Sequence, residues 1–423
     1  MGESRRDFLR KIAIAGAGAA MVANPFGQAF AAGGNKKVRI AVIGTGGRGR
    51  LLLEHLLIII KEGGNCEISA ICDNYQPSLD MAVKLCVKYK SKVNTFSDYR
   101  KLLKDNVPDG VVIATPLHQH AHITIDSMNA GIHVLVEKSM ARTLDDVKAM
   151  YDVHKQTGSV LMVGHQRLFS KRYLNAMDRI HKGELGEIGQ VRAYWHRNKN
   201  WRRKVPKDKP ELERQINWRL YKEYSAGLLT ELMSHQLQVA NWALEQVPVS
   251  VTGTGSIRYW NDGREVNDNI AAIFSYADGT QFIYDSMTSN KKYGCEEQIM
   301  GHKATMELET NKLILEKPPK PKPAPGIAQL ISDIKKDTFQ SIPVGGASWA
   351  PETALKYNGE PIYNSQKGDG TKEELLGFVD CIRQGKNIDW VTAEGYNTSI
   401  WSLLTEQAID TGQKLTMPEK YII

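Results

Sequence analysis

The chain has 423 residues, of which 42% are hydrophobic and 24% are charged. This length exceeds what one compact core usually supports, so we expect two domains, and the composition excludes a disordered chain. No apolar run reaches the roughly 18 residues of a membrane span, and the net charge of +8 comes without a nucleic-acid-binding motif, which argues against membrane insertion and a nucleic-acid partner.

The first 31 residues are typical of a twin-arginine signal peptide. Arg5-Arg6 is followed by Phe8-Leu9, a short and weakly apolar stretch, and a small-x-small cleavage site at Ala29-Phe30-Ala31. We therefore predict an exported, periplasmic protein that uses the twin-arginine export machinery. That machinery carries folded proteins, often with a cofactor already bound.

Residues 36–167 alternate between short apolar strands and helices, which predicts a doubly wound parallel sheet of the Rossmann type. The expected strands are Val38–Ile43, Ile68–Cys72, Val111–Thr115, His133–Val136 and Val160–Val163. The expected helices run from the glycine-rich loop to about Lys61 and over Pro77–Tyr89, Ala121–Ala130 and Thr143–Gln156.

Residues 168–423 change rhythm and predict an α+β domain with an open, mainly antiparallel sheet, so the chain as a whole is of the α/β class. The expected strands are Ile188–His196, Val249–Tyr259, Asn269–Tyr276, Thr280–Met287, Glu296–Met300, Ala304–Glu309 and Lys312–Glu316. Helices are expected over Lys372–Gln384 and Thr392–Thr411. The stretch 317–370 is basic and extended at first, then irregular, and nothing in it predicts a role.

No metal site is expected from the cysteines, whose number is odd and whose spacing contains no CxxC pair. They are Cys66, Cys72, Cys86, Cys295 and Cys381.

The strongest chemical signal is the sequence Gly44-Thr45-Gly46-Gly47-Arg48-Gly49, which follows a predicted strand and opens a predicted helix. Gly44 permits a tight turn, Gly46 the approach of a pyrophosphate, and Gly49 close packing of helix on strand, with the helix N-terminus facing the anion. Asp73 ends the second strand and is suited to a ribose 2′-hydroxyl. NAD is therefore predicted, because the Asp73 carboxylate would repel the 2′-phosphate of NADP. NADP remains a less favoured alternative, because Arg48 in the loop could contact a phosphate.

Four later segments resemble the glucose–fructose oxidoreductase/inositol dehydrogenase (Gfo/Idh/MocA) family. Residues 114–120 (ATPLHQH) resemble its ATPxxxH segment, 133–139 (HVLVEKS) its HVLxEKP motif, 163–167 (VGHQR) its VGxxR segment and 231–235 (ELMSH) its DxxxH motif. Ser139 stands where the family has Pro, and Glu231 where it has Asp. The resemblance implies a Rossmann domain, a second sheet that meets the nicotinamide, and a homo-oligomer.

The resemblance also implies site residues. It adds cofactor contacts at Thr115, Pro116, His120, Glu137, Lys138 and Gln166. It assigns Lys138 to stabilise alkoxide character and His235 to move the hydroxyl proton, with Glu231 four residues earlier on the same helix face to orient His235. Candidate substrate contacts are His165, Arg167, Trp195, His196, Trp201 and His235; the rings among these suit a sugar.

These observations predict an exported NAD-dependent oxidoreductase that acts on a secondary ring hydroxyl of a sugar or glycoside, at C3, and gives a 3-keto sugar. The cofactor is expected to be tightly bound, because no NAD pool exists outside the cytoplasm. A redox-neutral NAD-dependent glycosidase that works by transient C3 oxidation and elimination is the alternative, and no residue separates the two. A non-catalytic sugar or nucleotide sensor is a second alternative, against which Lys138 and His235 count.

Overall fold

A computed structural model of the chain describes residues 37–317, 359–363 and 368–423. The predicted export signal and most of the stretch 317–370 lie outside these residues. Within them, no helix is both long and apolar enough to span a bilayer.

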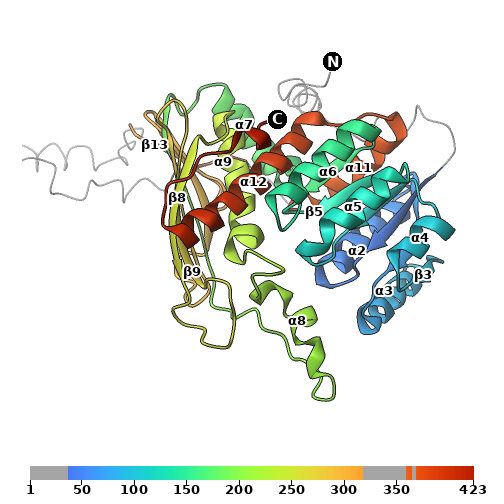
Figure 1. Ribbon diagram of the computed structural model, residues 1–423. Coiled ribbons are helices and arrows are strands. Elements are labelled where there is room, and N and C mark those ends of the chain that lie inside the picture. Colours follow the sequence, from blue (N-terminus) through green and yellow to red (C-terminus); the bar gives the residue numbers. More distant parts are fainter. Residues whose placement is uncertain (1–36, 318–358, 364–367) are drawn as a thin grey trace, which may run out of the picture.

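The N-terminal part forms a six-stranded, wholly parallel sheet in the order β3-β2-β1-β4-β5-β6, as predicted for a Rossmann fold. Its central strands are apolar on both faces because helices cover both sides (Figure 1). The strands are β1 Val38–Ile43, β2 Cys66–Cys72, β3 Asn94–Phe96, β4 Gly110–Ile113, β5 His133–Glu137 and β6 Leu161–Gly164. The helices are α2 Gly47–Lys61, α3 Gln76–Lys88, α4 Tyr99–Asp105, α5 His120–Asn129 and α6 Leu144–Thr157.

The second part is built on an eight-stranded sheet in the order β14-β13-β12-β11-β7-β10-β9-β8. All its strand pairs are antiparallel except β7 with β10, so the predicted mainly antiparallel sheet is confirmed. The strands are β7 Ile188–His196, β8 Ser250–Ser256, β9 Asn269–Ser275, β10 Gln281–Met287, β11 Cys295–Gly301, β12 Ala304–Glu307, β13 Lys312–Leu315 and β14 Glu360–Pro361.

Helices α7 (Lys171–His181), α9 (Ser234–Leu244) and α12 (Asp389–Thr411) lie along one face of this sheet, and no described helix covers the other (Figure 1). The side chains alternate accordingly: in β9, Ile270, Ala272 and Phe274 are buried, while Ile273 is 42% exposed. The homo-oligomer implied by the resemblance stays a prediction.

The two C-terminal helices join the two parts. Helix α11 (Thr371–Gln384) packs against α2 of the parallel sheet, and α12 contacts both β6 and β8. The side chain of Trp401 in α12 is fully buried against Phe274 of β9, at a ring-centroid distance of 6.4 Å. The space between the two sheets is therefore fixed by a common core, and the candidate site lies at the carboxyl ends of the parallel strands.

Candidate active site

The glycine-rich loop joins β1 to α2 and lies where the strand order of the parallel sheet reverses, between β1 and β4. Gly44 has a φ of +88°, and a Cβ atom there would come within 2.6 Å of the backbone nitrogen of Thr115. A Cβ atom at Gly49 would come within 1.8 Å of the Gly44 carbonyl oxygen. Both positions therefore require glycine, for the reasons that the sequence predicted.

Asp73 follows β2 and fixes this loop through its carboxylate. Oδ2 accepts hydrogen bonds from the backbone N–H of Thr45 at 2.7 Å and from its hydroxyl at 3.1 Å, while Oδ1 accepts from the Tyr75 N–H at 2.8 Å. A carboxylate has acceptor sites for more than these three donors. Asp73 also lines the adjoining cavity, so it remains available to a ribose hydroxyl.

A cavity of about 540 Å³ extends along the loop and the strand ends. A Cβ atom at Gly46 or Gly47 would meet nothing within 4 Å, so backbone there is open to a ligand. Of the predicted cofactor residues, this cavity is lined by Gly44, Gly46, Gly47, Arg48, Asp73, Thr115 and Pro116. An open helix N-terminus with a carboxylate at the second strand end fits a dinucleotide.

A second cavity, of about 240 Å³, adjoins the first and brings the predicted catalytic residues together. It is lined by Lys138 after β5, by Glu231 and His235 from the second domain, and by Trp218 and Arg219. The other predicted residues in its wall are Arg48, Thr115, His120, Glu137 and Gln166.

Lys138 crosses from the first domain to the second. Its ammonium donates to the backbone carbonyl oxygens of Thr230 at 3.2 Å and Glu231 at 3.0 Å. Both carbonyls belong to a π-helical turn, η6 (Leu229–Met233), that precedes α9. An ammonium has three N–H donors, so one remains for a ligand. Burial lowers the pKa of Lys138, although Glu231 and Glu137 act in the opposite direction. The Lys138–Ser139 peptide is cis.

His235 is 8% exposed and lines the second cavity. Its Nδ1 is buried without a hydrogen-bond partner among the described residues, so we expect Nε2 to be the ring nitrogen that meets a substrate. Burial and the charges of Lys138 and Arg167 hold the pKa of His235 well below its usual range. The ring is therefore neutral near pH 7 and can accept a proton.

The sequence had suggested that Glu231 orients His235, but the structure places its carboxylate elsewhere. Its carboxylate accepts a hydrogen bond from Nε of Arg219 at 2.6 Å, and no hydrogen bond joins it to His235 in the described structure. Burial alone would raise the pKa of Glu231, but Arg219 and Lys138 outweigh it and the pKa is lowered. Glu231 therefore places a fixed negative charge beside the Lys138 ammonium.

Two other predicted residues, His120 and Arg48, line the second cavity and are held by hydrogen bonds to the protein. His120 is buried, and its ring nitrogens lie 3.0 Å from the carbonyl oxygens of Thr115 and Ser139, so it ties together the two strand ends that carry the site. Arg48 donates through Nε to Glu137 at 2.6 Å. Arg48 is thus engaged by a carboxylate, although it still borders both cavities.

His165 and Trp195 lie behind His235 and do not line either cavity. Their rings contact that of His235 at centroid distances of 6.1 and 5.8 Å. Burial lowers the pKa of His165 to about 3, with the charges of Lys138 and Arg167 adding to the effect. Both side chains therefore help to orient the His235 ring. The sequence had assigned this role to Glu231.

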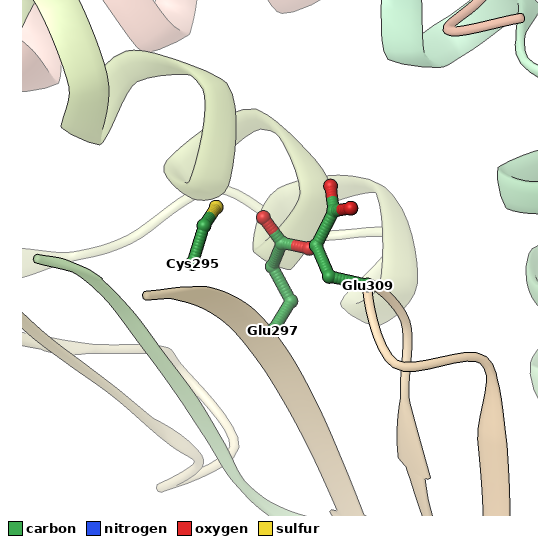
Figure 2. Close-up of side chains that lie close together, drawn as sticks. All are labelled: Cys295, Glu297 and Glu309. Atoms are coloured by element: carbon green, nitrogen blue, oxygen red, sulfur yellow. The ribbon is translucent and has the colours of Figure 1, made fainter. Parts of the chain in front are cut away.

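Arg167 lies deeper still, in a buried ion-pair cluster with Glu297 and Glu309. Figure 2 shows these two carboxylates near Cys295, and possible ligand atoms of the three residues lie within 4.8 Å of one another. The guanidinium groups of Arg167 and Arg172 already neutralise the carboxylates. Burial raises the pKa of Cys295 to about 12, which keeps the thiol protonated. We assign the cluster to structure and not to a metal, because both carboxylates are already paired with arginine side chains.

The structure places His196 and Trp201 away from both cavities. Trp195 and His196 are adjacent in β7 and therefore point to opposite faces of the sheet. On the uncovered face, Nε2 of His196 lies 2.5 Å from Oδ2 of Asp285, and its ring contacts that of Tyr293. Trp201 is half-buried and packs against the core.

The predicted site residues did not include those that the segment between β7 and η6 brings to the site. Arg203, Lys204, Trp218 and Arg219 line the first cavity together with the glycine-rich loop. The segment contains α8 (Glu213–Ile216) and the short helices η4 (Pro210–Leu212) and η5 (Trp218–Leu220). Its basic and aromatic composition was a signal for ligand contact, but no periodicity indicated where it folds.

Comparison with known proteins agrees with this arrangement. The profile of the "Oxidoreductase family, NAD-binding Rossmann fold" matches residues 38–165, and that of the "GFO/IDH/MocA C-terminal domain" matches residues 173–307. These matches confirm the predicted resemblance, NAD as cofactor and the oxidoreductase class.

Known relatives include a glycosyl hydrolase family 109 protein of Shewanella baltica, which is 24% identical over 410 residues, or 90% of this chain and 84% of the relative. An alpha-N-acetylgalactosaminidase of Shewanella oneidensis is 30% identical over 190 residues, or 38% of this chain and 40% of the relative. A structure of levoglucosan dehydrogenase in complex with NADH and levoglucosan has the same fold, with a TM-score of 0.68 at 20% identity over 91% of this chain and all of that one.

Proposed function

Because the chain belongs to the Gfo/Idh/MocA family of NAD-dependent oxidoreductases, we propose that it oxidises a secondary ring hydroxyl of a sugar or glycoside by removing the hydride from the carbon that bears it, C3. One observation carries the proposal: Lys138 and His235 come from different domains and line one small cavity that adjoins the dinucleotide cavity. A hydrogen-bond donor and a neutral base on one cavity are what alcohol oxidation needs.

When bound, NAD supplies the hydride acceptor. The chain's own residues manage the proton and the charge on oxygen. Two of the Lys138 N–H groups are held by the Thr230 and Glu231 carbonyls, so the third is aimed by the protein and stabilises negative charge on the substrate oxygen. Nε2 of His235 accepts the hydroxyl proton, because its lowered pKa keeps the ring neutral.

A second candidate, the redox-neutral glycosidase, is favoured by the likeness to the glycosyl hydrolase family 109 protein over 90% of the chain. In this chemistry the C3 ketone acidifies the C2 proton, a base removes that proton, the C1 substituent leaves, water adds, and the ketone is reduced again. Both candidates begin with the same proton and hydride removal at C3.

Product analysis separates the two candidates. The NAD-loaded protein is incubated with a panel of methyl and nitrophenyl glycosides, and products are identified by mass spectrometry. Release of the aglycone with an intact sugar indicates the glycosidase, and a stable 3-keto glycoside indicates net oxidation. Binding of sugars without any turnover of any glycoside would support the sensor and contradict both.

Export with a tightly held cofactor is the remaining part of the proposal. It is supported by the twin arginines at Arg5 and Arg6 and by the weakly apolar stretch that follows them. Replacing both arginines by Lys should leave the uncleaved precursor in the cytoplasm, as measured by cell fractionation. Unchanged secretion of this double variant would remove the export proposal.

A further inference from the structure

The segment 197–224 leaves the second domain after β7 and reaches the first domain. Nε2 of Gln215 in α8 donates to Oδ1 of Asn74, just beyond the second strand end, at 3.2 Å. Figure 1 shows α8 extending away from the second sheet. The cavity along the glycine-rich loop therefore has one wall from each domain.

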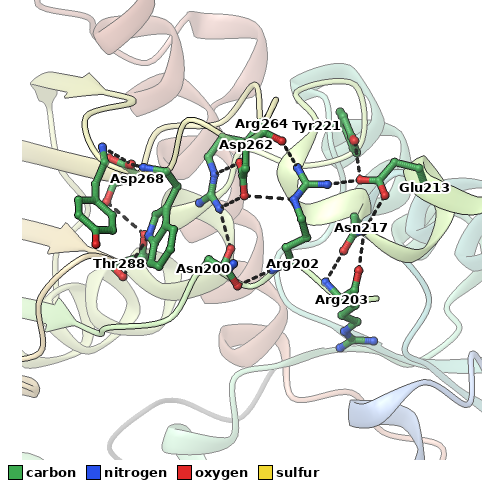
Figure 3. A network of polar contacts seen from close by, with 12 residues as sticks. Asn200, Arg202, Arg203, Glu213, Asn217, Tyr221, Asp262, Arg264, Asp268 and Thr288 are labelled. Atoms are coloured by element: carbon green, nitrogen blue, oxygen red, sulfur yellow. Dashed lines mark hydrogen bonds and ion pairs between the residues drawn. The ribbon is translucent and has the colours of Figure 1, made fainter. Parts of the chain in front are cut away.

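A network of charged side chains holds this segment in place (Figure 3). Asp262 accepts hydrogen bonds from Nε of Arg264 at 2.8 Å and from Nε of Arg202 at 3.1 Å, and Arg202 also pairs with Glu213. Glu213 in turn accepts from the Tyr221 hydroxyl at 2.8 Å. Two arginines thus face two carboxylates, so the charges within the network balance.

Arg203 is fixed by its backbone only. Its N–H donates to Oδ1 of Asn217 at 2.7 Å, and its carbonyl oxygen accepts from Nδ2 of Asn217 at 3.1 Å. Asn217 is buried. The Arg203 guanidinium points away from the network (Figure 3) and has no hydrogen-bond or ion-pair partner among the described residues. The fold thus positions this side chain without neutralising it.

The neighbours of the Arg203 guanidinium in the cavity are other cations. The Arg203 side chain is exposed to solvent. The desolvation that remains lowers the pKa of Arg203, and the charges of Arg219 and Arg50 lower it further, against a smaller opposite effect of Glu231. Arg50 donates to the Thr45 carbonyl in the glycine-rich loop at 2.7 Å. An anion bound among these groups would relieve their repulsion and gain charge-assisted hydrogen bonds.

We infer that Arg203 is a phosphate clamp, supplied by the second domain, that closes on the cofactor pyrophosphate from the side opposite the glycine-rich loop. The anion at that place follows from the loop, because Gly46 and Gly47 expose the N-terminus of α2 to the same cavity. This inference rests on the proposed tight retention of NAD and supplies a cause for it: a cofactor held from both domains leaves slowly.

Two other anions would meet the same cavity, and each gives a different pattern of effects. The 2′-phosphate of NADP would make Arg203 matter for NADP and not for NAD. A carboxylate or phosphate on the sugar would make it matter for substrate binding only. A pyrophosphate clamp affects NAD, NADP and ADP-ribose alike, and affects AMP less.

The test measures release of nucleotide from the full-length protein without any sugar present. Labelled NAD, NADP and ADP-ribose are released into excess unlabelled nucleotide, and AMP affinity is measured by titration. Arg203→Gln should speed the release of all three dinucleotide-type ligands by about 10- to 100-fold, the worth of one charge-assisted pair. Arg203→Lys should fall between wild type and Arg203→Gln, because it keeps the charge and loses the planar fork. Lys207→Gln removes an exposed charge of the same segment outside the cavity and should release nucleotide like wild type.

Release from Arg203→Gln at the rate of Lys207→Gln would overturn the clamp, and so would an effect on NADP alone. If Arg203→Gln does not melt cooperatively, Arg203→Lys and Asn217→Ala replace it, and both must release NAD faster than wild type for the clamp to stand. Because no sugar is used, failure of the clamp is distinct from failure of sugar oxidation, which only the glycoside panel reports.

Discussion

Replacing His235 by Ala should slow hydride transfer in the first turnover by about 10²–10⁴-fold while NAD still binds. The loss is expected because His235 is a neutral base in the wall of the small cavity, and its ring contacts the buried ring of His165 and the half-buried ring of Trp195. The measurement is the single-turnover reduction of bound NAD at saturating sugar, monitored through the near-ultraviolet absorbance of the reduced nicotinamide.

Two controls make this result specific. His55→Ala removes a histidine of α2 that lines neither cavity, so it should leave the rate unchanged. Added imidazole should restore part of the rate of His235→Ala.

The pH dependence of the wild type gives a further test. Because burial and the charge of Lys138 lower the pKa of His235, its neutral form persists as pH falls, and wild-type activity should decline only below the ordinary histidine pKa of about 6.5. Near-normal transfer by His235→Ala at every pH would place the proton acceptor elsewhere.

Replacing Lys138 by Met should cause a loss of similar size, about 10²–10⁴-fold in the same measurement. Met keeps the unbranched side chain up to the position of Cε and removes the N–H donors, both the one for the substrate oxygen and the two bound to Thr230 and Glu231. The stabilisation of developing alkoxide charge is therefore lost, and so is one connection between the domains.

The matched control is Lys148→Met, which removes a surface lysine paired with Asp152 on α6 and should not change the rate. A thermal melt with and without NAD shows whether Lys138→Met still folds and binds the cofactor. If Lys138→Met folds, binds NAD and transfers hydride at the wild-type rate, Lys138 has no role in catalysis. Recovery of activity by small alkylamines in Lys138→Ala would support its role as a hydrogen-bond donor.

The glycine-rich loop was predictable because local sequence alone determines it. The need for glycine at Gly44 and Gly49 follows from backbone contacts within the loop and with the next strand. Strand β7 was also predicted with its observed bounds, since its apolar residues alternate with polar ones. By contrast, β3 and α4 were not predicted: β3 has only three, mostly polar residues at a sheet edge, and α4 only seven residues.

The role given to Glu231 failed for a geometric reason. Residues four apart share a face in an α-helix, but η6 is a π-helical turn, in which the i to i+4 spacing no longer aligns side chains. Its carboxylate turns to Arg219, which precedes it by 12 residues on an irregular segment. The spacing of this pair follows no helix or strand period, so the sequence pattern could not predict it.

The basic segment after β7 shows the same limit. The predicted substrate contacts in and next to it were Trp195, His196 and Trp201. In the structure, His196 lies on the uncovered face of the sheet, where it contacts Asp285. Arg203 and Arg219 line the cofactor cavity instead. Alternation along β7 separates Trp195 from His196, whereas the path of the segment depends on the Asn217 and Asp262 contacts, which are distant in sequence.

The central claim is that a hydride passes from C3 of a sugar ring to the bound NAD, between Lys138 and His235. The most direct measurement mixes NAD-loaded protein rapidly with an accepted glycoside that carries deuterium at C3. The account predicts that reduced nicotinamide appears within the first turnover, more slowly than with the unlabelled glycoside, and that mass spectrometry of the quenched nucleotide finds the deuterium on its ring. Turnover of the glycoside without any deuterium reaching the nucleotide would contradict it.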